Sequence, residues 1–99
     1  MEKPQKNIWL ELADDLASLL EGSVSSEFVK EKYFHQEVSD EFDHVMCRLA
    51  HFLDDGDIRD RDERYKKMQN KEMRKLIRLI RSGDYTEASL VHFLGESEV

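Results

Sequence analysis

Apolar residues recur at helical intervals along most of this chain. In the segment 5–21 they lie three and four residues apart, which predicts an amphipathic helix with a single apolar stripe: Trp9, Leu12, Ala13, Leu16, Leu19 and Leu20. Gly22 follows at the position where helices often end in left-handed backbone conformation. The one proline, Pro4, and only four glycines leave few other interruptions to helix.

Two further helices are expected between residues 25 and 54. Ser25 is a predicted N-cap, with Val24 and Val29 placed as a hydrophobic staple around it. Ser39 is a second predicted N-cap, and the helix after it has the most regular apolar stripe of the chain: Phe42, Val45, Met46, Leu49, Phe52 and Leu53. Since neither Gly nor Pro separates the two segments, one continuous helix over 25–54 is the alternative.

The pattern after residue 54 predicts a turn at 54–57 and a fourth helix over 59–81. Its apolar residues share a face with Ile58: Tyr65, Met68, Met73, Leu76, Leu79 and Ile80. Asp84 is placed to cap a fifth helix, with Glu87 completing a variant of the capping box. The apolar residues of this last helix are Leu90, Val91, Phe93 and Leu94.

These patterns together predict an all-α fold, a single-domain bundle of four to five helices joined by short turns. At this length the whole chain, 1–99, is expected to form one domain, with frayed ends at 1–4 and 96–99. Leu49 and Leu76 lie at the centres of their apolar stripes. They are therefore expected in the core.

A short segment, Gly-Asp-Tyr-Thr-Glu-Ala at 83–88, resembles the turn between the two helices of a tetratricopeptide repeat. The resemblance implies a tight helix hairpin over 72–94. A repeat protein would show a period of about 34 residues elsewhere in the chain. This sequence has no such period, so no function is inferred from the resemblance.

Composition indicates the cellular compartment in which the protein acts. With one cysteine, Cys47, the chain forms no internal disulfide, which favours a reducing compartment. No apolar run approaches the roughly 18 residues of a membrane span, and residues 1–4 lack the apolar core of a signal peptide. We therefore expect a cytoplasmic protein that does not associate with membranes.

One polar stripe contains residue types that can bind metals. Asp40, His44, Cys47 and His51 are spaced four, three and four residues apart, and His with Cys suits zinc. Four ligands along one helix span too great a length to surround a single ion, and Cys47 lacks the surroundings of a catalytic nucleophile. We predict no catalytic residue, no cofactor and no metal, and keep a metal or thiol site around Cys47 as the third hypothesis.

Charge is distributed unevenly along the chain. The net charge is −7, yet the segment 59–81 contains ten basic and four acidic residues and is therefore +6, which leaves −13 on the remainder. The predicted helix has most of these cations on the side away from its apolar face: Arg64, Lys67, Lys71, Arg74, Lys75, Arg78 and Arg81.

Three interpretations of this basic stripe are open: a solvated face partly neutralised by the domain's own acidic helices, a surface that docks a protein, or a surface that contacts nucleic-acid phosphates. The leading hypothesis is a non-enzymatic protein-binding module, an adaptor, regulator or inhibitor with segregated acidic and basic surfaces, whose acidic part could neutralise a basic partner. The alternative is a nucleic-acid-associated regulator using 64–81. The charge of −7 and the lack of interleaved aromatic residues disfavour it. A homo-oligomer is also possible.

Overall fold

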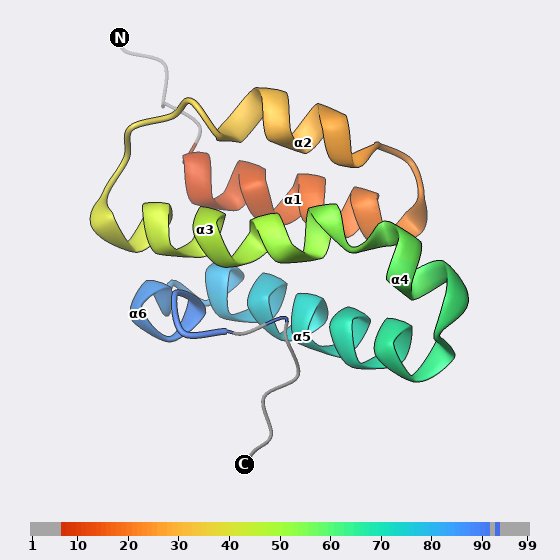
Figure 1. Cartoon of the computed structure of the whole chain (residues 1–99). Coiled ribbons are helices and arrows are strands. Elements are labelled where there is room, and N and C mark those ends of the chain that lie inside the picture. The colour runs from red at the N-terminus through yellow and green to blue at the C-terminus, as the bar shows by residue number, and fades with distance from the viewer. Residues whose placement is uncertain (1–6, 92, 94–99) are drawn as a thin grey trace, which may run out of the picture.

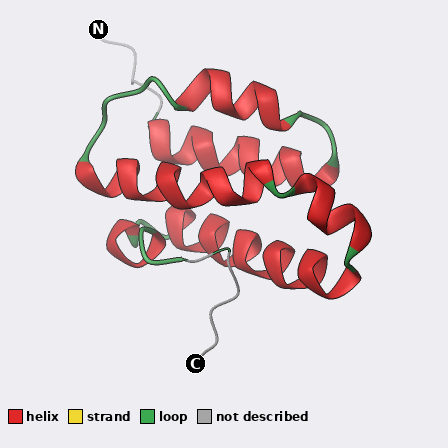
Figure 2. Ribbon diagram, in the orientation of Figure 1, coloured by secondary structure: helices red, strands yellow, loops and turns green. Residues whose placement is uncertain are grey.

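The structure is a computed structural model that describes residues 7–91 and 93. Helices make up most of these residues. In chain order they are α1 (Ile8–Glu21), α2 (Ser26–Tyr33), α3 (Asp40–Asp54), α4 (Gly56–Arg61), α5 (Glu63–Arg81) and α6 (Tyr85–Ala88). No strand occurs within these residues (Figure 2). The all-α prediction is confirmed, while the ends expected to fray lie outside the described residues.

The four longer helices form a bundle (Figure 1). α1 lies between α2 and α5 and makes its most extensive packing against α5. α3 runs alongside them, the short α4 leads from α3 to α5, and α6 packs against both α3 and α5. None of these helices is long and apolar enough to cross a membrane.

The buried apolar side chains form one continuous core. It contains the predicted stripe of the third helix and most of that of the first, whose Leu19 and Leu20 are only partly buried against it. Leu49 and Leu76 are both buried as expected. Trp9 joins three elements, because its ring stacks on Tyr85 at 4.3 Å and meets Phe42 edge-on at 5.1 Å. Such aromatic pairs add specific geometry to the area that they bury. The N-terminal helix is therefore fixed against both α3 and α6.

The predicted end of the first helix and the predicted N-caps of the next two helices are confirmed. Gly22 has a φ of 83°, the left-handed conformation that closes α1. The hydroxyls of Ser25 and Ser39 accept hydrogen bonds from the backbone N–H groups of Phe28 and Phe42, which caps α2 and α3. The alternative of one continuous helix over 25–54 is wrong, because a non-helical segment at 34–39 separates α2 from α3.

The helix predicted over 59–81 is instead two helices. Asp62 has extended backbone, with φ −130° and ψ 106°, and its Oδ1 accepts hydrogen bonds from the N–H groups of Arg64 and Tyr65. Asp62 is therefore the N-cap of α5, and α4 occupies part of the expected turn at 54–57. Because of this break, Ile58 is 39% exposed and does not share the buried face of α5.

The last predicted helix is shorter than expected. Gly83 adopts the left-handed conformation, with φ 82°, and α6 packs back against α5, in agreement with the expected hairpin turn. However, α6 ends at Ala88, and the Asp84 side chain makes no capping hydrogen bond. The described residues that follow it, 89–91 and 93, are not helical, with Leu90 56% exposed and Phe93 buried. Leu94 lies outside the described residues.

The core assignment can be tested by truncation. Leu49→Ala and Leu76→Ala should each lower the free energy of unfolding by about 2–5 kcal/mol, because both remove buried methyl groups and leave a cavity. Leu90→Ala is the matched control, since its exposed side chain should cost less than about 0.5 kcal/mol. Urea titrations of the three variants measure this, and equal losses at all three positions would contradict the packing.

Candidate functional site

The long helix α5 has two opposite faces with different roles. One face is buried against the bundle: Gln69, Met73, Leu76, Ile77 and Ile80. Of the predicted stripe, Met73, Leu76 and Ile80 are buried, whereas Tyr65, Met68 and Leu79 are only partly buried. Gln69 and Ile77, which the predicted stripe did not include, are buried as well. The same helical period places the predicted cations on the other side. Packing of one face therefore fixes which way the other points.

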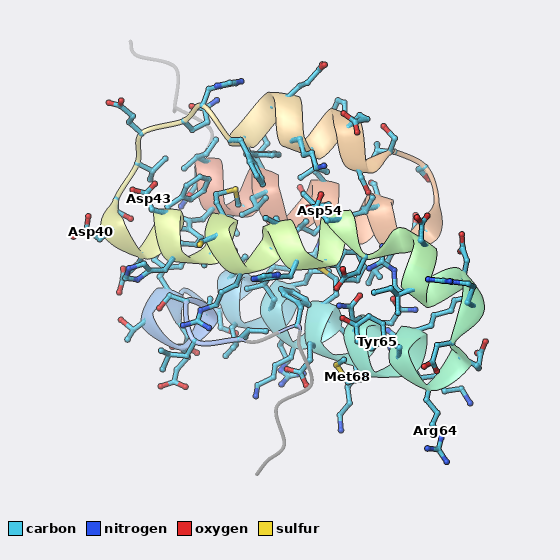
Figure 3. The ribbon with its side chains drawn as sticks, in the orientation of Figure 1. Asp40, Asp43, Asp54, Arg64, Tyr65 and Met68 are labelled. Carbon is cyan, nitrogen blue, oxygen red and sulfur yellow. The ribbon has the colours of Figure 1, made fainter. Side chains whose placement is uncertain are left out.

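All seven predicted cations are exposed. We call them the cationic face of α5: Arg64, Lys67, Lys71, Arg74, Lys75, Arg78 and Arg81. Figure 3 shows Arg64 pointing away from the bundle, whereas its neighbour Tyr65 points inward, toward α4. The cationic face therefore lies in solvent along one side of α5.

The cationic face is almost free of acidic partners. Among the described residues only Arg81 is paired, with its Nη2 atom 2.9 Å from Asp14 Oδ1. Among the residues that the structure describes, the side chains of the other six cations form no ion pair and no hydrogen bond. Neutralisation by the domain's own acidic helices is therefore confined to one end of the face.

Acidic residues elsewhere are paired with different cations. Lys32 Nζ lies 2.8 Å from both Glu11 Oε2 and Asp15 Oδ2, which joins α2 to α1. Hydrogen bonds to Asp15 and then to Glu11 raise the pKa of Lys32. Lys30 is likewise 2.8 Å from Asp54 in α3. These carboxylates stabilise the contacts of α2 rather than the charges on α5.

The spacing within the cationic face is unfavourable for helix stability. Lys67, Lys71 and Lys75 follow one another at intervals of four residues, as do Arg74 and Arg78. Like charges at this spacing lie next to each other on a helix and destabilise it by about 0.2–0.5 kcal/mol per pair. Favourable charge pairing within α5 therefore does not account for the pattern.

A buried polar network holds the N-terminal half of α5. Gln69 is fully buried, and its Nε2 donates to Phe93 O at 2.8 Å, Tyr65 Oη at 3.0 Å and Asp55 Oδ2 at 3.2 Å. Its Oε1 accepts a hydrogen bond of 2.5 Å from Arg59 Nη1. Because these polar groups find partners, the network holds α4, α5 and the backbone of Phe93 together.

Arg59 and Tyr65 connect this network to its surroundings. Arg59 Nη1 also donates to Phe52 O at 2.5 Å, and its guanidinium lies 3.8 Å from the centre of the Phe52 ring. Burial lowers the pKa of Arg59. Tyr65 Oη donates to Asp55 Oδ2 at 2.6 Å, and burial together with this hydrogen bond raises the pKa of Tyr65 to about 12.

Sequence analysis did not identify this network. A glutamine on the apolar face of a predicted helix was the available signal, since a buried amide needs partners. Those partners, Asp55 and Arg59, lie on the preceding elements, and their contact with Gln69 depends on the break at Asp62. The network positions α5 and is not itself an open site.

The predicted metal or thiol stripe lies on the outer side of α3. His44, Cys47 and His51 are exposed there, and Cys47 is a free thiol. Asp40 begins the same helix, as Figure 3 shows. Within the described residues, no group of three or more His, Cys, Asp or Glu side chains converges as a metal site would require. The structure thus places these residues in one row without bringing further ligands to them.

The tyrosine in the buried network predicts sensitivity to alkali. Free tyrosine has a pKa near 10, and the folded protein raises that of Tyr65 to about 12. The protonated hydroxyl therefore contributes stability that is fully present below about pH 10 and is lost as the pH rises through about 12. Tyr65→Phe should reduce the loss of stability over this interval, as measured by urea titrations at a series of pH values. If Tyr65→Phe loses as much stability as the native protein over this pH interval, Tyr65 is not the cause of the alkaline loss.

The unpaired state of the cationic face has a direct consequence for stability. Replacing Lys71, Arg74 and Arg78 together with Gln should leave the melting temperature unchanged or raise it, because no ion pair is lost and repulsion is relieved. Lys32→Gln is the matched control. It should lower the melting temperature, since it leaves two neighbouring carboxylates without their shared cation. A triple variant that melts well below the native protein would show that the cationic face is structural.

Comparisons of this chain with protein-family models, with curated proteins and with solved structures found no match. The function of the cationic face is accordingly argued from its own residues and geometry. Its defining properties are seven exposed cations in one row, six of them without a partner among the described residues.

Proposed function

We propose that this protein is a non-enzymatic, cytoplasmic protein-binding module whose cationic face of α5 docks an acidic segment of a partner protein. The observation that carries the proposal is the set of six exposed cations that have no acidic partner in the described domain. The like charges of this row are spaced so that their repulsion destabilises the helix. Such a row is typical of a surface whose charges are neutralised by another molecule. The exposed free thiol of Cys47 fits a reducing compartment.

The dimensions of the cationic face suit a single segment of polypeptide. Arg64 and Arg81 are seventeen residues apart, which corresponds to roughly 25 Å along the helix axis. An acidic helix of similar length, laid alongside α5, would meet every cation of the row. An extended segment of about eight residues covers the same distance. Electrostatic complementarity of this kind mainly accelerates association and selects the partner.

A narrow partner fits the surroundings of the face better than a nucleic acid does. Asp14 is 61% exposed beside Arg81, and Glu21 is exposed on the same helix. A broad polyanion lying on α5 would approach these carboxylates and be repelled. The aromatic ring nearest the start of the row, Tyr65, is turned inward to Asp55 and offers no stacking surface for bases.

Neutralisation of a basic partner by the acidic remainder of the chain has weaker support. Glu11, Asp14, Asp15 and Asp54 are already paired with cations of the same domain. A basic partner that docked on these four carboxylates would have to replace those contacts. Apart from Arg81, the cations of the cationic face have no such competing partner within the described residues.

The proposal is tested with defined polyanions. A synthetic peptide made of Glu and Ala should bind the protein, and the affinity should fall steeply as salt is raised, because the contacts are exposed and screened. Lys71→Gln should slow association more than Lys66→Gln, which removes the same charge from α5 outside the cationic face. Surface plasmon resonance separates the two rate constants.

Two results would contradict this function. If duplex DNA of the same total charge binds more tightly than the acidic peptide, the face serves nucleic acid. If neither probe binds, or if Lys71→Gln and Lys66→Gln behave alike, the cationic face is only solvated.

A further inference from the structure

Beside the cationic face there is a hollow between α1 and α5, with a volume of about 410 Å³. We infer that this hollow receives one large apolar side chain of the acidic partner segment, and so anchors the segment that the cationic face attracts. The inference rests on the proposed function. It adds the chemical character of the partner: an acidic segment with a Leu, Phe or Trp among its carboxylates.

The floor of the hollow is apolar. Ala17 and Leu20 of α1 face Ile77 of α5 across it. Ala17 and Leu20 are only partly buried by their own domain. At Ala17 the side chain is a single methyl group, and this small residue leaves room where a larger one would fill the space. An apolar side chain inserted here would cover surface that water now contacts, which is favourable.

The rim of the hollow carries the charge that matches an acidic segment. Arg74 and Arg81 belong both to the rim and to the cationic face, so a segment lying along the face passes over the opening. Arg81 is held at the α1 side by Asp14. The amide of Asn70 supplies a hydrogen-bonding group at the same rim. Glu21 lies there too, which disfavours a second carboxylate inside the hollow and favours an apolar group.

The cationic face and the hollow would act on different rate constants of binding. Exposed charges at the edge of an interface chiefly set the association rate, and they lose their effect in salt. Apolar side chains seated in pockets chiefly set the lifetime of a complex. The hollow also lies within the volume range of sites that enclose apolar groups with a few polar contacts. A cationic face without the hollow would attract acidic proteins with little discrimination, whereas the two together specify one kind of segment.

The test uses a pair of synthetic peptides of equal length and net charge, made of Glu and Ala. One has a single central Trp and the other a Ser at the same position. The Trp peptide should bind at least about tenfold more tightly, with the difference in the dissociation rate, because burial of one large side chain supplies that factor. The difference should persist at high salt.

Filling the hollow provides the matching variant. Ala17→Met places a flexible side chain into the space at a position where the helix tolerates it. Ser18→Met makes the same addition at the next residue of α1, which does not line the hollow. Ala17→Met should abolish the preference for the Trp peptide, while Ser18→Met should retain it. Melting curves of both variants establish that they fold.

The outcomes separate this inference from the proposed function. If both peptides bind equally, in a salt-dependent manner that Lys71→Gln weakens, the docking function stands and the inference about the hollow is overturned. If the Trp peptide is preferred but Ala17→Met leaves the preference intact, the apolar side chain sits elsewhere, and the inference fails again. If neither peptide binds, both proposals are wrong.

Discussion

The hydrogen bonds of the Gln69 amide determine which face of α5 points toward solvent. They tie the middle of this helix to Arg59 in α4, to Asp55 at the end of α3 and to the backbone of Phe93. A buried amide without partners is costly, so the helix cannot rotate about its axis without losing several contacts at once. The cationic face lies on the side of α5 opposite Gln69. Fixing the amide inward therefore fixes the charges outward.

The cations of this domain occupy two kinds of environment. Lys32 and Lys30 connect helices through carboxylates, and Arg59 is enclosed by the buried network. On the cationic face of α5, Arg81 alone has an acidic partner among the residues that the structure describes. Natural proteins commonly give up some stability at surfaces that serve another purpose. The contrast, within the described residues, between paired and unpaired cations is the physical basis for proposing a binding role for α5.

The sequence predicted most of the helices, but not every boundary or contact. Periodicity was sufficient for α1 and α3, where Gly22 and Ser39 also marked the ends. It failed at Asp62, because an acidic residue between charged neighbours resembles an ordinary helix surface until its capping hydrogen bonds are seen. The composition of the cationic face could be predicted, since spacing decides which side of a helix a residue occupies.

Tertiary information was needed for the remainder of the candidate site. The absence of acidic partners around Lys71 or Arg78 within the described residues depends on where distant carboxylates lie. The hollow between α1 and α5 depends on the small side chain of Ala17 meeting a helix sixty residues further along the chain. Neither is encoded in a local pattern. Both follow from how two helices pack.

The crowding of positive charge along α5 also couples folding to the ionic surroundings. In the unfolded chain these cations are spread apart, whereas folding brings Lys67, Lys71 and Lys75 onto adjacent turns of one helix. We therefore expect the folded protein to hold multivalent anions more tightly than the unfolded chain does, and by thermodynamic linkage such anions would stabilise the fold. The charges that weaken the free helix become a source of stability once an anionic molecule is bound.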